Sequence, residues 1–201
     1  EATIVPDGAG GALVTWRDFR AGPTDIYAQR ISASGAPLWT ANGVAVCTAA
    51  NEQSSPRIVS DGAGGALVTW RASRAGHFDI YAQRISAGGT VQWTANGVAL
   101  CAAGFDQLAP TMVPDGAGGA IVTWHDLRSG TNHDVYAQRI NASGVVQWTA
   151  NGVALCTVAN GQYTTAIAPD GAGGATAAWQ NKVRATRDAL TAQRISAVGV
   201  P

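Results

Sequence analysis

Charge is scarce in this sequence, and lysine is almost absent. Charged residues make up 13% of the 201 residues, about half of the share usual in soluble proteins, and Lys182 is the only lysine. The 13 basic and 13 acidic residues cancel to a formal net charge of zero, so no long-range field attracts the chain to nucleic acid. Hydrophobic residues reach 46%, which is enough to bury a core. We expect a folded protein that binds no nucleic acid.

Long apolar runs and the common motifs of catalysis and metal binding are also missing. No run approaches the roughly 18 apolar residues of a membrane-spanning helix, so we expect no membrane insertion. There is no phosphate loop, no Gly-x-Ser-x-Gly elbow, no calcium loop and no Cys-x-x-Cys pair. Cys47, Cys101 and Cys156 occupy one repeat position, which predicts free buried thiols. We predict no cofactor and no bound metal.

Internal repetition is what the sequence has in abundance. The block Asp-Gly-Ala-Gly-Gly-Ala starts at Asp7, Asp61, Asp115 and Asp170, which puts the copies 54, 54 and 55 residues apart. A tryptophan closes the apolar run after each block, and Asp-(Ile/Val)-Tyr-Ala-Gln-Arg-Ile follows in the first three copies. A second tryptophan, within Trp-Thr-Ala-Asn-Gly-Val-Ala, also occurs in three copies.

Each repeat contains short β-rich runs bounded by turn residues. In the second repeat they span 57–59, 66–70, 79–85 and 91–101, the last with a bend at Asn96 and Gly97. The Asp-Gly-Ala-Gly-Gly segments are interpreted as structural turns, and no segment has helical periodicity. A four-stranded antiparallel unit repeated at this interval is typical of a β-propeller blade. We predict an all-β β-propeller of four repeats of about 54 residues, the last without its fourth strand.

The repeats span approximately 1–54, 55–108, 109–163 and 164–201, and they form a single propeller or a propeller fragment. A linear stack of sheets is the alternative architecture. The missing strand leaves three arrangements open. The chain is a piece of a longer array, a ring of four blades with one incomplete blade, or one of two chains that join into a larger ring.

The second repeat carries a resemblance to a known family. It contains Ser-Pro-Arg-Ile-Val-Ser-Asp-Gly at 55–62, then an apolar strand, then Arg-Ala-Gly-His-Phe-Asp-Ile-Tyr at 74–81. This order is similar to the WD-like propeller repeats of TolB-type proteins, in which Ser-Pro-Asp-Gly, an apolar strand, Asp-Arg-x-Gly and Asp-Ile-Tyr follow one another. The resemblance implies a β-propeller. It implies no particular activity, because that family spans translocation scaffolds, peptidase propellers and lyases.

The loops after the second run of each repeat, and those that join one repeat to the next, vary between copies, whereas the other turns hardly change. Binding residues concentrate in loops held on a rigid scaffold, so we predict that ligands bind on this variable face. Its arginines, polar groups and aromatic rings suit a glycan or a peptide. The candidate ligand-binding residues are Arg17, Asp18, Arg71, His77, His125, Asp126, His133 and Gln180.

Two further expectations concern the same loops. Arginines recur a few residues before aspartates, so we expect each arginine to pair with its aspartate across the loop, in the pairs Arg20–Asp25, Arg74–Asp79 and Arg128–Asp134. The three histidines are expected to be exposed in these loops, with His125 and His133 close enough to be neighbours.

These observations predict a non-enzymatic propeller module, secreted or at the cell surface, that binds a glycan, peptide or protein or takes part in structural assembly. A glycan-active enzyme of glycosidase or sialidase type is one alternative, because such propellers use loop arginines and carboxylates; Asp18 and Asp126 are the conceivable carboxylate pair. The other alternative is self-association through the unpaired edge of the last repeat, giving an oligomer or a filament.

Overall fold

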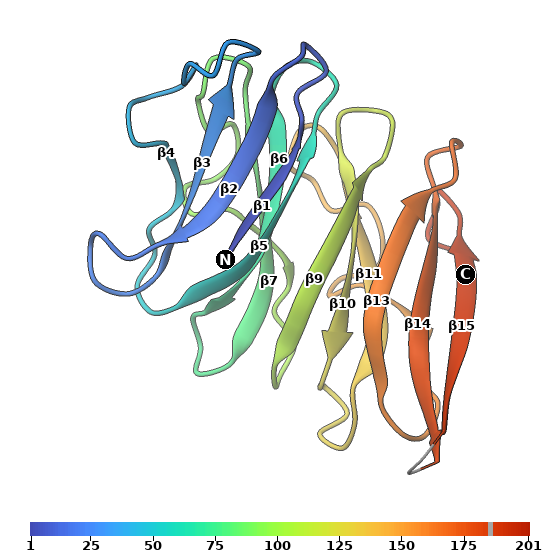
Figure 1. The fold of residues 1–201 in the computed structure, drawn as a ribbon. Helices are drawn as coiled ribbons and strands as arrows, with labels where there is room; N and C mark the ends of the chain where they lie inside the picture. The colour runs from blue at the N-terminus through green and yellow to red at the C-terminus, as the bar shows by residue number, and fades with distance from the viewer. Residues whose placement is uncertain (185–186) are drawn as a thin grey trace.

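The computed structural model describes residues 1–184 and 187–201, and the regular structure in these ranges is β throughout (Figure 1). The strands form four antiparallel sheets in chain order, which we call blades 1 to 4. Blade 1 holds β1 (Ala2–Pro6), β2 (Ala12–Asp18), β3 (Asp25–Ile31) and β4 (Val44–Cys47); blade 2 holds β5 (Gln53–Ser60), β6 (Ala66–Ser73), β7 (Phe78–Ile85) and β8 (Val98–Cys101); blade 3 holds β9 (Gln107–Pro114), β10 (Ala120–Asp126), β11 (Asp134–Ile140) and β12 (Val153–Cys156); blade 4 holds β13 (Gln162–Pro169), β14 (Ala175–Arg184) and β15 (Arg187–Ile195). The prediction of four repeats with a three-stranded last blade is confirmed.

An aspartate fixes the first turn of each blade. Asp7 Oδ1 accepts hydrogen bonds from the backbone N–H groups of Ala9 and Gly11, both at 2.8 Å, and Asp7 Oδ2 lies 2.9 Å from Arg30 Nη2. Gly10 has a φ of 84°, which glycine adopts without strain. The ion pair recurs in the other blades as Asp61–Arg84, Asp115–Arg139 and Asp170–Arg194. The predicted structural turns are confirmed.

The hydrophobic core lies between the blades. The second strands of blades 2 and 3 are buried along most of their length, and Trp70 and Trp124 are fully buried. One apolar cluster joins blade 1 to blade 2, a second joins blade 2 to blade 3, and a third joins blade 3 to blade 4. Each blade therefore depends on its neighbour to cover its apolar face.

The Trp-Thr-Ala-Asn-Gly element links each blade to the next. Trp39 donates from Nε1 to the carbonyl of Ala87 in blade 2 at 3.0 Å, and a Cβ on Gly89 would lie only 2.7 Å from the indole ring. Trp93 and Trp148 make the same bond to Ala142 and Ala197, at 3.1 and 3.0 Å. Because the tryptophans leave the sheet to reach the neighbouring blade, the regular fourth strands are only four residues long.

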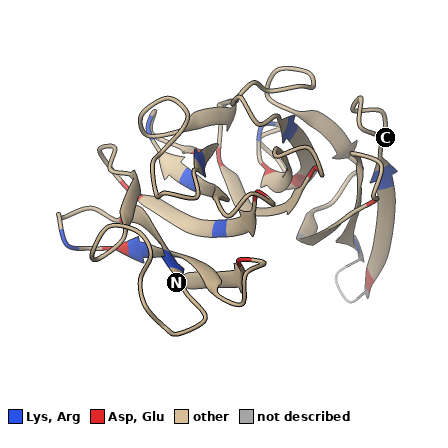
Figure 2. Cartoon of the chain, turned by 90° about the horizontal axis from the view of Figure 1, so that it is seen from above, with Lys and Arg blue, Asp and Glu red and all other residues tan. Residues whose placement is uncertain are grey.

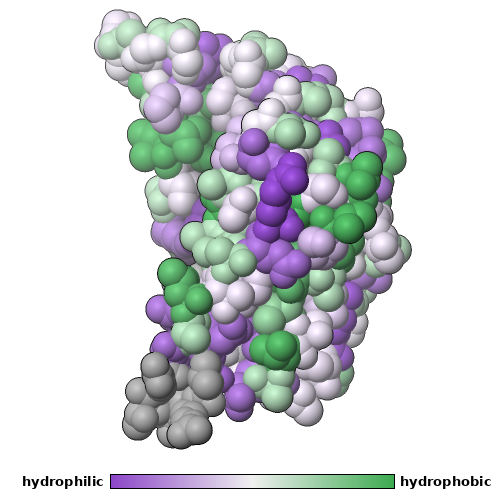
Figure 3. Space-filling view, turned by 90° about the vertical axis from the view of Figure 1, so that its right-hand side faces the viewer, coloured by the Kyte–Doolittle hydropathy of each residue, from purple (hydrophilic) through white to green (hydrophobic). Residues whose placement is uncertain are grey.

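The blades lie side by side along an arc, with blades 1 and 4 at its two ends (Figure 2). β5 packs on β1 and β2, β9 on β5 and β6, and β13 on β9 and β10. The described residues therefore pack sequentially, as propeller blades do. They do not close into a ring of four blades, which was one of the three arrangements that the sequence allowed. The outward face of blade 4 carries hydrophobic groups between polar ones (Figure 3), with Leu190 of β15 exposed.

Candidate functional site

Two sets of loops meet at one end of the blades, which we call the loop face. One set joins the second and third strands of a blade, and the other joins one blade to the next. Hydrogen bonds tie the two sets together at the blade junctions. The backbone N–H of Gln53 donates to Thr24 O at 3.0 Å, and the N–H of Gln162 donates to His133 O at 2.8 Å. The predicted variable face is thus formed jointly by neighbouring blades.

A buried glutamine anchors each loop between blades. Gln53 Nε2 donates to Asn51 O at 2.8 Å and to Ala49 O at 3.0 Å, so the glutamine side chain closes its own loop. Gln107 and Gln162, which are also fully buried, bond their loops in the same way. These bonds fix the residue immediately before each glutamine at a blade junction; the three residues are Glu52, Asp106 and Gly161.

Each junction holds a pocket on the loop face, and the three pockets differ in chemistry. The first junction pocket, of about 380 Å³, is lined by Arg17, Phe19, Gly22, Pro23, Thr24 and Glu52. The second, of about 270 Å³, is lined by Gly76, His77, Phe105, Asp106, Leu127 and Gly130. The third, of about 460 Å³, is lined by Leu127, Thr131, Asn132, His133, Asn160, Gly161, Tyr163 and Lys182. The near-identical repeats therefore present an asymmetric loop face.

A histidine and a carboxyl group line the second junction pocket, and a second carboxyl group adjoins the histidine. Nδ1 of His77 lies 3.1 Å from Oδ1 of Asp79, the buried aspartate of β7. Asp106 enters from the neighbouring loop and accepts a hydrogen bond from the backbone N–H of Phe78 at 2.8 Å. Burial raises the pKa of Asp79, His77 lowers it, and the charge of Asp106 raises it again. His77 and Asp106 therefore line the pocket, and the buried Asp79, whose pKa is raised by burial, adjoins it through His77.

An aromatic ring forms one wall of this pocket. Phe105 is 60% exposed and has a φ of 62°, a left-handed conformation that is uncommon for a bulky residue. Its ring passes close to Gly130, where a Cβ would lie 3.5 Å from the ring edge. An exposed ring held beside carboxyl groups offers an apolar face to a polar ligand.

The third junction pocket adjoins a cluster of aromatic side chains. The ring centroids of His133 and Tyr163 are 4.9 Å apart, and His125 lies 6.0 Å from His133 and 6.1 Å from Tyr163. The predicted closeness of His125 and His133 is confirmed, but the predicted exposure of His125 is wrong. His125 lies within β10 and is buried beside His133 and Tyr163, and burial together with the charge of His133 lowers its pKa to about 4.

The remaining candidates on strand ends have different surroundings. Arg17 lies 3.9 Å from Glu52 and over the ring of Phe19, so it belongs to the first junction pocket. Arg71 is held by Ser54, whose Oγ accepts from Arg71 Nε at 2.8 Å, and by the ring of Phe78. Gln180, at the equivalent position of β14, is exposed and lines none of the three pockets.

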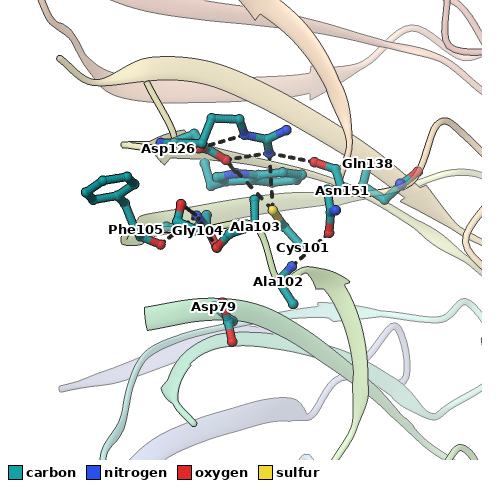
Figure 4. A network of polar contacts seen from close by, with 12 residues as sticks. Asp79, Cys101, Ala102, Ala103, Gly104, Phe105, Asp126, Gln138 and Asn151 are labelled. Carbon is teal, nitrogen blue, oxygen red and sulfur yellow. Dashed lines mark hydrogen bonds and ion pairs between the residues drawn. The ribbon is translucent and has the colours of Figure 1, made fainter. Parts of the chain in front are cut away.

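Asp18 and Asp126 serve the framework of their blades. In blade 3, Trp124 Nε1 donates to Asp126 at 2.8 Å, and Arg128 donates from Nε at 2.8 Å and from Nη2 at 2.6 Å to the same carboxylate (Figure 4). In blade 1, the Arg20 guanidinium holds the pKa of Asp18 far below its ordinary value. Neither carboxylate lines any of the three junction pockets, so the structure does not bring this predicted pair together in one of them.

The expected arginine pairs across the loop are also wrong. Arg20 and Arg128 pair with Asp18 and Asp126 at 2.6 Å, and Arg74 donates to the carbonyl of Asn96. The expected partners Asp25, Asp79 and Asp134 are buried directly opposite Asp18, Ala72 and Asp126 in the strand register, and burial is the main cause that raises their pKa values.

Sequence reasoning missed Glu52 and Asp106 as pocket residues. The available signal was their position immediately before the retained glutamines Gln53 and Gln107, which marks a fixed point in a variable loop. Within residues 1–184 and 187–201, no group of three His, Cys, Asp or Glu side chains is arranged to hold a metal ion. The same described residues include no helix long and apolar enough to cross a membrane.

Comparisons with known proteins place the fold. No family model matches the chain, and no curated protein matches it, so the resemblance to TolB-type repeats stays a prediction. Among solved structures, the chain is similar to an endo-arabinase from Bacteroides thetaiotaomicron, with a TM-score of 0.51 and 14% identity over 96% of this chain and 74% of that one. It is also similar to an α-L-arabinanase from Penicillium chrysogenum solved with arabinobiose, with a TM-score of 0.55 and 13% identity over 92% of this chain and 58% of that one.

These matches contradict the prediction of a non-enzymatic module, because both matched structures are enzymes that act on glycans. They favour the glycan-active alternative, and they agree with a glycan among the predicted ligands. The chain spans 74% and 58% of the two matched structures, and at 14% and 13% identity the likeness establishes the fold alone. The fold of this chain is that of a β-propeller.

Proposed function

We propose that this chain is part of a glycan-active β-propeller enzyme that hydrolyses glycosidic bonds, with its reacting groups in the second junction pocket. The observation that carries the proposal is the meeting of His77, Asp79 and Asp106 beside the exposed ring of Phe105. Glycoside hydrolysis uses two carboxyl groups in different protonation states, one to donate a proton and one to act as a base or nucleophile.

The two carboxyl groups have environments that suit these different roles. Asp79 is buried, burial raises its pKa, and its Oδ1 lies 3.1 Å from Nδ1 of His77. Because His77 lines the pocket, it is the group that passes a proton to the oxygen of the leaving sugar. Asp106 also lines the pocket and takes a proton from water. The water oxygen then bonds to the anomeric carbon as the bond from that carbon to the leaving oxygen breaks.

The aromatic residues of the loop face supply the binding surface. Phe19 and Phe105 are both strongly exposed and belong to successive junction pockets. Sugar rings pack their C–H faces on such rings while their hydroxyl groups bond to neighbouring charged side chains, here Arg17 and Glu52. Arabinan is the first substrate to examine because of the two matched enzymes. A polymeric substrate of this kind is consistent with the predicted extracellular location.

The test measures release of reducing sugar from arabinan and arabino-oligosaccharides by this chain and its variants. We expect Asp106→Asn and His77→Gln each to lower the rate about 100-fold or more. Asp188→Asn, at the repeat position of Asp79 but exposed, is the matched control. Unchanged rates in the two pocket variants, or binding of these glycans by the wild-type chain without cleavage, would overturn the proposal.

A further inference from the structure

Blade 2 lacks a carboxylate that blades 1 and 3 contain. The third residue of the Trp-x-Asp segment is Asp18 in blade 1 and Asp126 in blade 3, but it is Ala72 in blade 2. In blade 3 the carboxylate accepts hydrogen bonds from Trp124 Nε1 at 2.8 Å and from Arg128 Nε and backbone N–H at 2.8 and 2.9 Å (Figure 4). Blade 1 repeats these contacts at 2.9, 2.7 and 2.9 Å.

The donors that surround this carboxylate are retained in blade 2. Trp70 is fully buried, and its Nε1 has no hydrogen-bond partner within the described part of the chain. Nε of Arg74 is likewise buried and unpaired there. A buried donor without an acceptor is costly, and the counterparts of these two donors in blade 3 both bond to the same aspartate, Asp126.

Arg74 also keeps the placement of its counterparts despite the missing partner. Its guanidinium lies 3.6 Å from the ring centroid of Tyr81, as Arg128 lies 3.8 Å from that of Tyr136. Nη2 of Arg74 contacts Cys47 Sγ at 3.7 Å and donates to the carbonyl of Asn96. Nη2 of Arg128 makes the corresponding contacts to Cys101 and Asn151, at 3.2 and 2.7 Å. The guanidinium is therefore held in place by groups other than a carboxylate.

The fourth blade shows that this position is otherwise filled by an acceptor. Asn181 replaces the aspartate, and its Oδ1 accepts from Trp179 Nε1 at 3.1 Å. Blade 2 is thus the one blade in which, among the described residues, the buried indole lacks an oxygen partner.

We propose that blade 2 binds a small carboxylate anion in the place of the missing aspartate side chain. One oxygen of the anion accepts from Trp70 Nε1 and Arg74 Nη2, and the other accepts from Nε of Arg74, as the oxygens of Asp126 do in blade 3. A carboxyl group is all that aspartate adds to alanine, and formate is that group, so formate is the matching probe. The neighbouring carboxyl of Asp79 does not exclude the anion, because Asp25 and Asp134 stand opposite Asp18 and Asp126 in the same way.

The experiment follows the indole N–H resonances of the 15N-labelled chain while formate replaces sulfate at constant ionic strength. The resonance of Trp70 is identified by its loss in Trp70→Phe. We expect this resonance to move saturably toward that of Trp124, while the other tryptophan indoles stay fixed. A Trp70 resonance that does not move, or a common drift of all seven indoles, would overturn the proposal.

Two variants separate the proposed site from a general effect of the salt. Ala72→Asp fills the space with the side chain of blades 1 and 3, and Ala72→Asn fills it with the side chain of blade 4. In both variants we expect the Trp70 resonance to be shifted without formate and to be insensitive to its addition. Ala72→Asn carries the test if Ala72→Asp does not fold. A full formate response in the folded variant would show that the anion binds elsewhere.

Discussion

Removal of the Asp126 carboxylate should destabilise the protein by an amount that the structure allows us to bracket. Asp126→Ala converts blade 3 to the composition of blade 2 at this position. The change breaks the 2.6 Å ion pair with Arg128 and leaves the buried Trp124 Nε1 without its acceptor. Removing one partner of a buried ion pair costs about 3–5 kcal/mol. Because the Arg128 side chain is 23% exposed and water can reach it, we expect a loss of about 2–3 kcal/mol.

The assay is urea unfolding followed by tryptophan fluorescence. The dependence of the unfolding free energy on urea concentration should be the same in the variant and the wild type, which shows that the unfolded state has not changed. Asp126→Asn keeps an acceptor for the indole, as Asn181 does in blade 4, and should cost about 1 kcal/mol less than the alanine change. Arg128→Ala combined with Asp126→Ala should cost less than the sum of the single changes, because no unpaired guanidinium remains. A loss below about 0.5 kcal/mol for Asp126→Ala, the range of ordinary surface changes, would refute this reasoning.

Three further outcomes follow from the structure. The pKa of His125 is about 4 in the folded protein and about 6.5 in an unfolded chain, so its contribution to the free energy of unfolding, at most about 3 kcal/mol, is complete above pH 6.5 and is lost as the pH falls toward 4. His125→Gln, which copies Gln180, should flatten this part of the curve of stability against pH, measured by urea unfolding. An unchanged slope of that curve would contradict the lowered pKa of His125. Gly144→Ala would place a Cβ 2.7 Å from the ring of Trp93 at a φ of 80°, and calorimetry should show a loss of about 1–3 kcal/mol, whereas an unchanged melting temperature would refute the tight contact between blades. Phe105→Ala should weaken glycan binding about tenfold in titration calorimetry without lowering stability, because its ring is exposed, and equal affinity would remove it from the binding surface.

Repetition made the fold predictable from the sequence. Each blade repeats the same turn aspartate, tryptophan and strand pattern, so the strands and turns assigned in one copy could be compared with those of the other three. The partners of the loop arginines were not predictable in this way, because Asp18 and Asp25 are both within reach of Arg20. The half-buried indole of Trp16 decides between them, since its N–H needs an acceptor and finds one on Asp18, two residues further along the same strand.

The candidate site was only partly predictable, because its residues come from different blades. His77 belongs to a loop of blade 2 and Asp106 to the loop that leads into blade 3, and their meeting depends on how the two blades pack. His125 was expected to be exposed because it was placed in a loop, but it lies within β10, and His133 and Tyr163 pack beside it from two other segments. Contacts between loops of neighbouring blades carry no local sequence pattern.

Glycan binding at the second junction pocket can be tested by backbone amide shift mapping with arabinotriose. We expect saturable shifts at the amides of residues 76–78, 105–107 and 127–130, with little change at the turns of residues 7–11 and 61–65 on the opposite end of the blades. Shifts confined to those turns, or no shifts at all, would contradict it.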